Sequence, residues 1–261
     1  MEARLSRGGM QAMDEKRRSR RSDVKNCENL SFAAKEAFKR LRTNLLLTFP
    51  DNDAFCPIIG VTSAQPAEGK STVALNLAYS LAELEKNVLL LDSDMRRPSI
   101  HVKANIERSP GLADLLSTSN TIASSVHKYQ SSTSATSFDI LPGGEVPSNP
   151  SELLTSKRME TLLKTLKTAY DFIILDLPPI GAVIDAVSVS KKTDGMLVVM
   201  RENHCPIGIL KDCVTQIQDA GVPILGFVVN GALEGAGKKY GYGYGYGYGK
   251  GYGSYYGSYY R

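Results

Sequence analysis

The sequence predicts an α/β fold in which a parallel sheet carries helices on both faces. Short apolar runs alternate with stretches of helical periodicity between residues 57 and 230, and this alternation is typical of parallel sheets built from crossover connections. One apolar run leads through a glycine-containing loop into a helix, and two later runs end in aspartate. With 261 residues, 42% of them hydrophobic, the chain is long enough to bury a substantial core.

The order of the expected elements follows from this alternation. Strands are expected at residues 57–61, 87–91, 138–141, 171–176, 195–200 and 224–229. Helical spacing or capping residues predict helices at residues 31–47, 71–86, 150–169, 183–191 and 206–220. Residues 99–137 are expected to be loop-rich with short helical pieces, and mobile over 117–137, where Ser and Thr are frequent.

The chain is organised around residues 61–72, where an apolar run meets a helix start. Backbone N–H groups of such a loop, together with the helix N-terminus, favour an anion, so the stretch predicts a phosphate-binding loop and a P-loop NTPase-like sheet. Lys70 can reach the β- and γ-phosphates of a nucleotide, and the Ser71 hydroxyl can ligate Mg²⁺. The alternative is a chance Gly-Lys-Ser, since Ala64 stands where the general pattern has glycine. The candidate ATP-binding residues of this loop are Ala64, Gln65, Pro66, Ala67, Glu68, Gly69, Lys70, Ser71 and Thr72.

Two further motifs place carboxylates at the ends of strands. Asp92 and Asp94 follow the run at 87–91, and Asp176 closes the run at 171–176. The carboxyl ends of strands form the ligand side of an open α/β sheet, so these aspartates suit a metal site and group transfer. Asp176 matches the Walker B arrangement, in which the carboxylate supports Mg²⁺. The alternatives are a turn with two solvated aspartates and an ordinary strand with a terminal aspartate.

Both ends of the chain differ from the middle in composition. Residues 1–28 are expected to form a disordered arm whose basic cluster at 16–21 is either solvated or in contact with anionic lipid. A globular domain is expected over 29–233, and a disordered Gly/Tyr-rich tail over 234–261. No apolar run approaches the ~20 residues of a membrane helix, no signal peptide is recognisable, and the cysteines lack metal or disulfide spacing. These features predict a cytoplasmic protein.

The tail tyrosines admit three interpretations. They are phosphoacceptors, stacking platforms for single-stranded nucleic acid, or parts of an adhesive low-complexity segment. No Arg-rich interleaving accompanies them and the net charge is only +4, so no nucleic-acid partner is expected. The tyrosines are Tyr240, Tyr242, Tyr244, Tyr246, Tyr248, Tyr252, Tyr255, Tyr256, Tyr259 and Tyr260.

Together the loop at 64–71, the motif at 89–98 and the motif at 172–179 resemble the Walker A, A′ and B set of bacterial protein-tyrosine kinases. These BY-kinases act in capsule and exopolysaccharide synthesis. Residues 141–154, residues 36–44 and the tyrosine tail also resemble that family, so the resemblance covers about residues 30–261. The lack of a membrane span resembles the CpsD/CapB type, in which a transmembrane activator is a second polypeptide.

The resemblance implies ATP and Mg²⁺ as cofactors and assigns roles to residues. Lys70 would neutralise charge on the transferring phosphoryl group, and Ser71, Asp94 and Asp176 would support Mg²⁺. Asp92 is the candidate acceptor of the tyrosine proton, although Asp92 and Asp94 could exchange roles. Asn230 is expected to contact adenine.

The resemblance also implies assembly and partners. An oligomerisation motif of the family reads Glu-x-x-Arg-x-x-Arg, and this chain has Glu36, Lys39 and Arg42 at those positions. The lysine keeps the charge but loses the guanidinium fork; ordinary surface pairing is the alternative use of these residues. The expected partners are a transmembrane activator or polysaccharide co-polymerase, further copies in a ring, and a tyrosine phosphatase. The expected location is the inner face of the cell membrane.

The predicted function is ATP-dependent tyrosine phosphorylation, including autophosphorylation of the tail in trans, which regulates capsular or exopolysaccharide synthesis and export. One alternative is a partitioning or site-determining ATPase of the same fold. Such ATPases carry a second lysine early in the loop, where this chain has none. Another alternative is a non-catalytic assembly protein switched by nucleotide.

Overall fold

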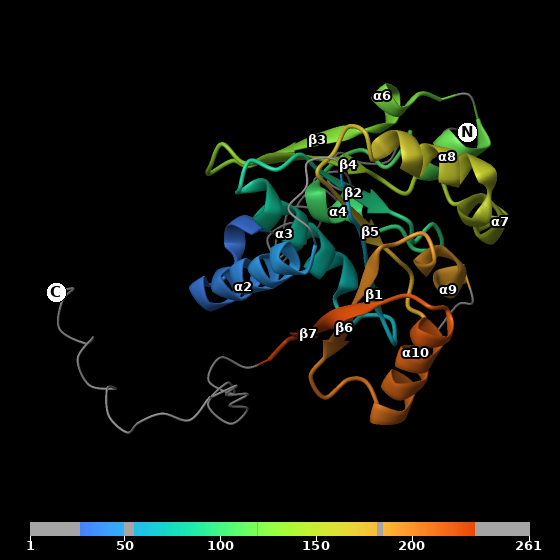
Figure 1. Cartoon of the computed structure of the whole chain (residues 1–261). Coiled ribbons are helices and arrows are strands. Elements are labelled where there is room, and N and C mark those ends of the chain that lie inside the picture. Colours follow the sequence, from blue (N-terminus) through green and yellow to red (C-terminus); the bar gives the residue numbers. More distant parts are fainter. Residues whose placement is uncertain (1–26, 50–54, 119, 182–184, 233–261) are drawn as a thin grey trace, which may run out of the picture. The chain divides into compact units, whose positions relative to one another are not determined.

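The fold is a seven-stranded sheet between two layers of helices (Figure 1). The computed structural model describes residues 27–49, 55–118, 120–181 and 185–232, so residues 1–26 of the predicted basic arm and the whole tyrosine tail lie outside the described residues. Sheet order is β3-β4-β2-β5-β1-β6-β7. The strands are β1 Ile58–Ser63, β2 Val88–Asp92, β3 His127–Gln130, β4 Ser137–Leu141, β5 Phe172–Asp176, β6 Gly195–Arg201 and β7 Ile224–Asn230.

Six of these strands are parallel, which confirms the predicted fold class. Only the pairing of β3 with β4 is antiparallel. Because parallel strands bring their carboxyl ends to one edge, the ends of β1, β2 and β5 meet there. Asp92 and Asp176 are direct neighbours across β2 and β5. The two acidic motifs and the phosphate loop are therefore brought together by sheet topology.

The described helices cover both faces of the sheet (Figure 1), and none of them is long and apolar enough to span a bilayer. They are η1 Cys27–Asn29, α2 Phe32–Thr48, α3 Lys70–Ala82, α4 Ile100–Ala104, α5 Leu112–Ser117, α6 Ile122–Ser125, α7 Pro150–Thr155, α8 Lys157–Leu166, α9 Asp185–Ser190 and α10 Ile207–Asp219.

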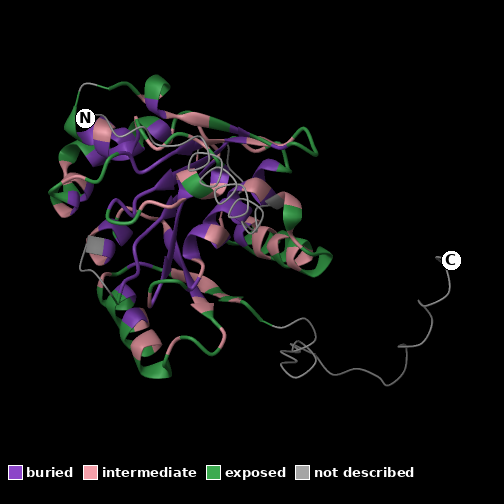
Figure 2. Cartoon of the chain, turned by 180° about the vertical axis from the view of Figure 1, so that it is seen from behind, coloured by how far each residue is buried: buried purple, intermediate pink, exposed green. Residues whose placement is uncertain are grey.

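Each face of the sheet has its own hydrophobic core. Along β2, Leu89 and Leu91 pack with residues of α5, α7, α8 and α10, while Leu90 packs with residues of α2, α3 and α4. This alternation follows from the two-residue period of a strand. Figure 2 shows the resulting buried interior of the sheet. The strands at the site are thus buried on both faces, which holds their ends in place.

Strand β3 contradicts the prediction of a loop-rich stretch over residues 99–137. It is only four residues long and its one buried side chain is Tyr129, so its alternation is too short to stand out in the sequence. Tyr129 stacks on Phe138 with ring centroids 4.9 Å apart and meets Tyr79 edge to face. Tertiary aromatic packing and pairing with β4 therefore make this strand, rather than local propensity.

The prediction of a single helix over residues 150–169 was also wrong, because the helix is interrupted at Ser156. Ser156 has extended dihedrals, and its Oγ donates to Leu153 O (2.7 Å) and accepts from Met159 N (3.2 Å). The same hydroxyl therefore caps the end of α7 and the start of α8. A serine that can bond locally to the backbone competes with helix continuation.

The predicted oligomerisation residues lie on α2 but make different contacts. Glu36 and Lys39 form an exposed ion pair at 2.8 Å. Arg42 turns towards α3 instead, where its Nη1 donates to Ser80 O and lies 3.3 Å from Glu83 Oε2. Its side chain is only 12% exposed. Arg42 therefore fastens α2 to α3 within the chain, and the role of the three residues in assembly stays a prediction.

Replacing Arg42 with alanine should lower the free energy of unfolding by about 1–2 kcal/mol, because a charge-assisted hydrogen bond is lost at a half-buried position. Lys39→Ala is the matched control on the same helix. It should change stability by less than about 0.5 kcal/mol, since an exposed ion pair contributes little. Urea unfolding of both variants measures the difference, and equal effects would contradict the assigned contact.

Candidate active site

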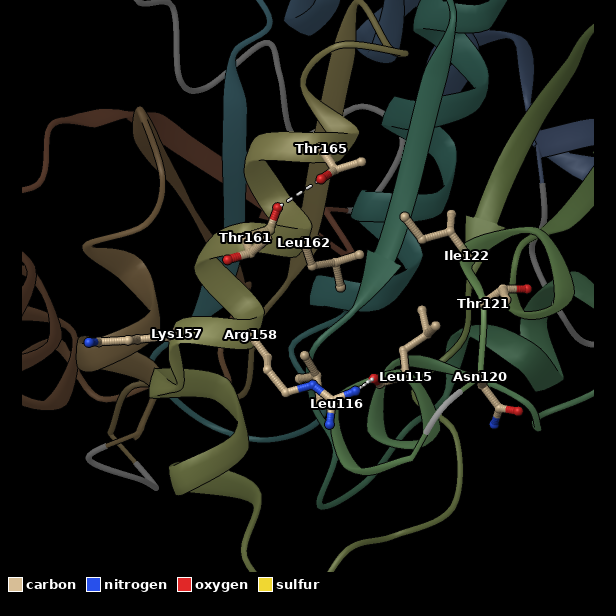
Figure 3. A pocket seen from close by; sticks show the side chains of 10 residues that line it. All are labelled: Leu115, Leu116, Asn120, Thr121, Ile122, Lys157, Arg158, Thr161, Leu162 and Thr165. Carbon is tan, nitrogen blue, oxygen red and sulfur yellow. Dashed lines mark hydrogen bonds between the residues drawn. The ribbon is translucent and has the colours of Figure 1, made fainter.

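A hollow of about 470 Å³ opens between α5, α6 and α8 (Figure 3). Leu115, Leu116, Ile122 and Leu162 supply much of its apolar lining. Arg158 extends along it and donates through Nη2 to the carbonyl groups of Leu115 (3.1 Å) and Thr118 (2.6 Å). None of its lining residues belongs to the phosphate loop or to the three aspartates, so the predicted chemistry lies elsewhere.

The phosphate loop connects the end of β1 to the start of α3, as predicted. Gly69 is the residue before the helix and has φ 97°, a left-handed conformation that favours glycine. Lys70 is the first residue of α3 and Ser71 the second. This places the free N–H groups of the helix, and the positive end of its dipole, beside the lysine. The local geometry is that of an anion-binding helix start.

Contacts from distant residues fix the shape of this loop. Glu68 is fully buried and accepts hydrogen bonds from Gln65 N (2.8 Å) and Arg201 N (3.4 Å). Asn230 Nδ2 donates to Glu68 O at 2.9 Å. A Cβ on Gly69 would lie 1.9 Å from that same Nδ2, so a larger residue here would displace the Asn230 side chain as well as strain the backbone.

Asn230 is therefore a neighbour of the phosphate loop, at the end of β7. Its predicted contact with adenine remains a prediction, whereas its support of the loop backbone is visible. Arg201 and His204 also support the loop, although no sequence motif marks them; the ring Nε2 of His204 lies 3.2 Å from Pro66 O. These contacts form between backbone groups and residues more than a hundred positions away, and no local pattern marks them.

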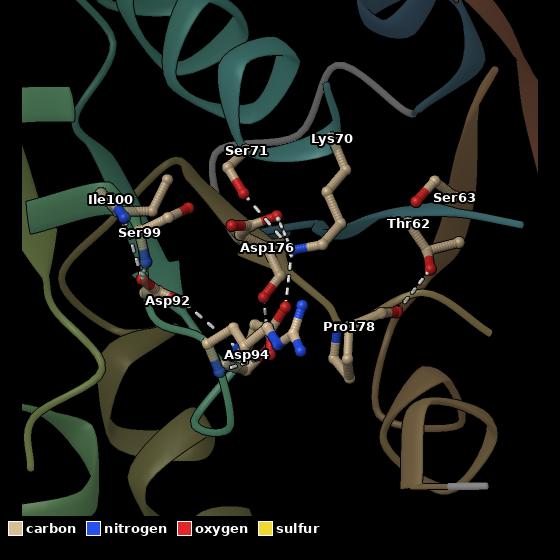
Figure 4. Close-up of polar contacts among 12 residues, drawn as sticks. Thr62, Ser63, Lys70, Ser71, Asp92, Asp94, Ser99, Ile100, Asp176 and Pro178 are labelled. Atoms are coloured by element: carbon tan, nitrogen blue, oxygen red, sulfur yellow. Dashed lines mark hydrogen bonds and ion pairs between the residues drawn. The ribbon is translucent and has the colours of Figure 1, made fainter. Parts of the chain in front are cut away.

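Lys70 is the centre of the site (Figure 4). Its Nζ lies 2.9 Å from Asp94 Oδ2, 3.3 Å from Asp176 Oδ1 and 3.3 Å from Ser71 Oγ. All four side chains are buried. Burial alone lowers the pKa of the Lys70 ammonium, but the charges of Asp176 and Asp94 outweigh burial and the net pKa is raised. Lys70 is therefore a charged counter-ion shared by two carboxylates.

Asp92 lies beside this group but points at the backbone. Its Oδ2 accepts from Ser99 N (2.9 Å) and Ile100 N (3.0 Å), and its Oδ1 accepts from Asp94 N (3.2 Å). Complete burial, then the nearby charge of Asp176, raise the pKa of Asp92 to about 7. Asp92 thus holds the loop that carries Asp94, and its carboxyl group exchanges a proton near neutral pH.

The residues present fit a magnesium ion. Asp176 Oδ2 is buried and has no hydrogen-bond partner among the described residues, and burial raises the pKa of this carboxyl group although Lys70 opposes the shift. Mg²⁺ prefers oxygen ligands, which Ser71, Asp94 and Asp176 offer. The described residues contain no cluster of three or more His, Cys, Asp or Glu arranged as a metal cage. Proteins commonly hold Mg²⁺ through one or two carboxylates, and water and substrate phosphates complete its coordination.

Comparison with known proteins identifies the family. The family model described as an AAA domain matches residues 57–220. The tyrosine-protein kinase YwqD of Bacillus subtilis (strain 168) is 34% identical over 196 residues, which cover 75% of this chain and 80% of YwqD. The chain belongs to the bacterial BY-kinases. The predicted resemblance to the tyrosine-protein kinases of capsule and exopolysaccharide synthesis is therefore confirmed.

Other BY-kinases are much longer than the matched region. The putative tyrosine-protein kinase EpsB of Ralstonia solanacearum is 37% identical over 195 residues, which are 75% of this chain but 25% of EpsB. The chain thus spans about a quarter of the length of this relative. Among solved structures, the kinase domain of Escherichia coli tyrosine kinase ETK has a TM-score of 0.71 and 30% identity, covering 84% of this chain and 80% of that domain.

The fold is also shared with the first predicted alternative. The septum site-determining protein MinD of Pyrococcus horikoshii, in complex with Mg-ADP, has a TM-score of 0.55 and 26% identity, covering 67% of this chain and 70% of MinD. This BY-kinase chain therefore has the sheet and phosphate loop of a nucleotide-binding ATPase. Fold alone does not separate the two activities.

Asp92→Asn should flatten the pH dependence of the free energy of unfolding between about pH 4 and 7. The folded chain holds a proton on Asp92 up to pH about 7, whereas the unfolded chain releases it near pH 4, so stability present at low pH is lost as pH rises through this range. Denaturant unfolding at several pH values measures the slope. The exposed Asp219→Asn serves as a control and should keep the wild-type slope. Equal slopes for wild type and Asp92→Asn would contradict the assigned titration.

Proposed function

We propose that this chain transfers the γ-phosphoryl group of ATP to tyrosine side chains of proteins. The observation that carries the proposal is the position of Lys70 Nζ at the start of α3, between Asp94 (2.9 Å) and Asp176 (3.3 Å). Phosphoryl transfer depends mainly on positioning and on neutralising charge over the phosphoryl oxygens. A buried lysine at a helix start, in a family of tyrosine-protein kinases, supports that role.

Each residue of the site has a proposed role. Lys70 would leave its carboxylate partners to contact the β- and γ-phosphates, while Asp94 and Asp176 with Ser71 would hold Mg²⁺ directly or through water. The ion, when bound, supplies further neutralisation of the phosphate charge. Asp92 is the proposed acceptor of the tyrosine proton because its pKa of about 7 matches the working pH of a general base. Asp94 contacts Lys70 directly, so exchange of the two roles stays open.

The tail tyrosines are the proposed first substrates, phosphorylated in trans by a neighbouring copy. Copies would associate through α2 in a ring, with Glu36 and Lys39 available on its exposed side and Arg42 supporting the helix from within. Each phosphate adds about −1.5 to −2 charges, so extensive phosphorylation would weaken the ring by repulsion. The family supports this cycle as a proposal, together with a transmembrane activator, a tyrosine phosphatase, and a site of action at the cytoplasmic face of the membrane. There the cycle would regulate capsular or exopolysaccharide synthesis and export.

Lys70→Met should abolish tyrosine phosphorylation. The ammonium acts on charge that develops during transfer, and its loss removes that stabilisation. Incubation with labelled ATP and Mg²⁺, followed by phosphoamino-acid analysis, measures the phosphotyrosine that forms. The matched control is Lys164→Met, on the exposed side of α8, which should keep wild-type labelling. Phosphate release without phosphotyrosine in the wild type would instead favour the ATPase alternative, and nucleotide binding without either product would favour the assembly protein.

A mixing experiment tests transfer between copies. A Lys70→Met chain with an intact tail should become labelled when an active chain truncated after residue 233 is added. The active chain lacks acceptor tyrosines in its tail, and the inactive chain cannot label itself. A Lys70→Met chain whose tail tyrosines are changed to phenylalanine is the control and should stay unlabelled. Absence of label on the intact tail would rule out transfer in trans.

A further inference from the structure

Lys103 is a second lysine at the phosphate loop that sequence analysis did not identify. It lies in α4, which packs beside α3 (Figure 1). The two amide groups at the start of α4, Ser99 N and Ile100 N, bind the carboxylate of Asp92. Asp92, the proposed acceptor of the tyrosine proton, therefore also helps to set the position of Lys103.

The ammonium of Lys103 is directed at the start of α3. Its Nζ lies 3.0 Å from Thr72 Oγ1, and the side chain is half-buried. Thr72 follows Ser71 directly and belongs to the first turn of the helix whose free N–H groups favour an anion. The hydrogen bond thus holds a positive charge next to the phosphate-binding end of α3.

The described residues provide no carboxylate within ion-pair distance of Lys103 Nζ. Some lysines in the described part of the chain do have such partners, as Lys39 has Glu36 and Lys192 has Glu160. Burial lowers the pKa of Lys103; the charge of Asp176 opposes this, and that of Lys70 adds to it. A half-buried ammonium without a counter-ion is costly, and an anion bound at the loop would compensate for that cost.

Lys70 is paired with carboxylates until a metal ion takes its place. Its ammonium is already shared by Asp94 and Asp176, so an arriving polyphosphate would compete with two carboxylates for it. Lys103, by contrast, has no carboxylate within ion-pair distance among the described residues. We infer that Lys103 is a second phosphate-binding lysine, which contacts the polyphosphate of the bound nucleotide. This inference rests on the nucleotide site of the proposed function.

The alternative is a purely structural tie between α4 and α3. The two roles differ in their dependence on charge and in what they stabilise. A purely structural contact would contribute to the stability of the nucleotide-free chain, whereas a phosphate contact would contribute to nucleotide affinity. Arginine keeps the positive charge and methionine keeps only the length of the side chain, so the pair of variants Lys103→Arg and Lys103→Met separates them.

The test is the dissociation constant of Mg·ADP, measured by calorimetry on the full chain, with the melting temperature of each nucleotide-free variant. Lys103→Met should bind ADP about tenfold more weakly or worse, the effect of losing one hydrogen bond to a charged group. Lys103→Arg should stay within about threefold of wild type. Both variants should melt close to wild type.

Two results would overturn the inference. One is wild-type ADP affinity in a folded Lys103→Met chain. The other is an equal loss of affinity in Lys103→Arg and Lys103→Met, which would show that charge is irrelevant. Lys164→Met is the control for removing a lysine far from the loop. If the wild-type chain bound no ADP at all, the proposed function itself would fail. If the wild-type chain bound ADP and Lys103→Met bound it equally well, only the inference about Lys103 would fail.

Discussion

One buried ammonium shared by two buried carboxylates holds this site together. Lys70 comes from the start of α3, Asp94 from the loop after β2, and Asp176 from the end of β5, so a single cation joins three segments that are distant in sequence. Removing one partner of a buried ion pair leaves an uncompensated charge and is costly, although the intact pair adds little net stability. The contact is better explained as positioning for an anion and a metal than as a source of stability.

The residues around Lys70 show how the fold keeps that arrangement rigid. Asp92 fixes the loop after β2 through backbone amides, and Glu68 and Asn230 fix the phosphate loop. These contacts are buried or partly buried and directional, so the helix start and the carboxylates keep one geometry. Such preorganisation is what charge stabilisation in phosphoryl transfer requires. Since the ATPases of this fold share the phosphate loop, specificity for tyrosine depends on features beyond it.

Local patterns predicted the phosphate loop and all three aspartates, because strand ends and a helix start are visible in the sequence. Topology then brought Asp92, Asp94 and Asp176 together, as expected for parallel strands. The inward turn of Arg42, the contact of Asn230 with the loop and the position of Lys103 were not predictable. Each depends on which helix or strand packs beside another, and the sequence around a single polar residue does not reveal its tertiary neighbour. Strand β3 was missed for the same reason, since its pairing and aromatic contacts are tertiary.

The central claim is that Lys70 exchanges Asp94 and Asp176 for nucleotide phosphate, while those carboxylates take a metal ion in its place. Calorimetric titration of ADP with Mg²⁺ and with a chelator tests it most directly. Without the metal, Lys70 is needed by its carboxylates and binding should be weak. With Mg²⁺, the affinity should rise by at least about tenfold, a difference of about 1.4 kcal/mol. Equal affinities under the two conditions would contradict the exchange.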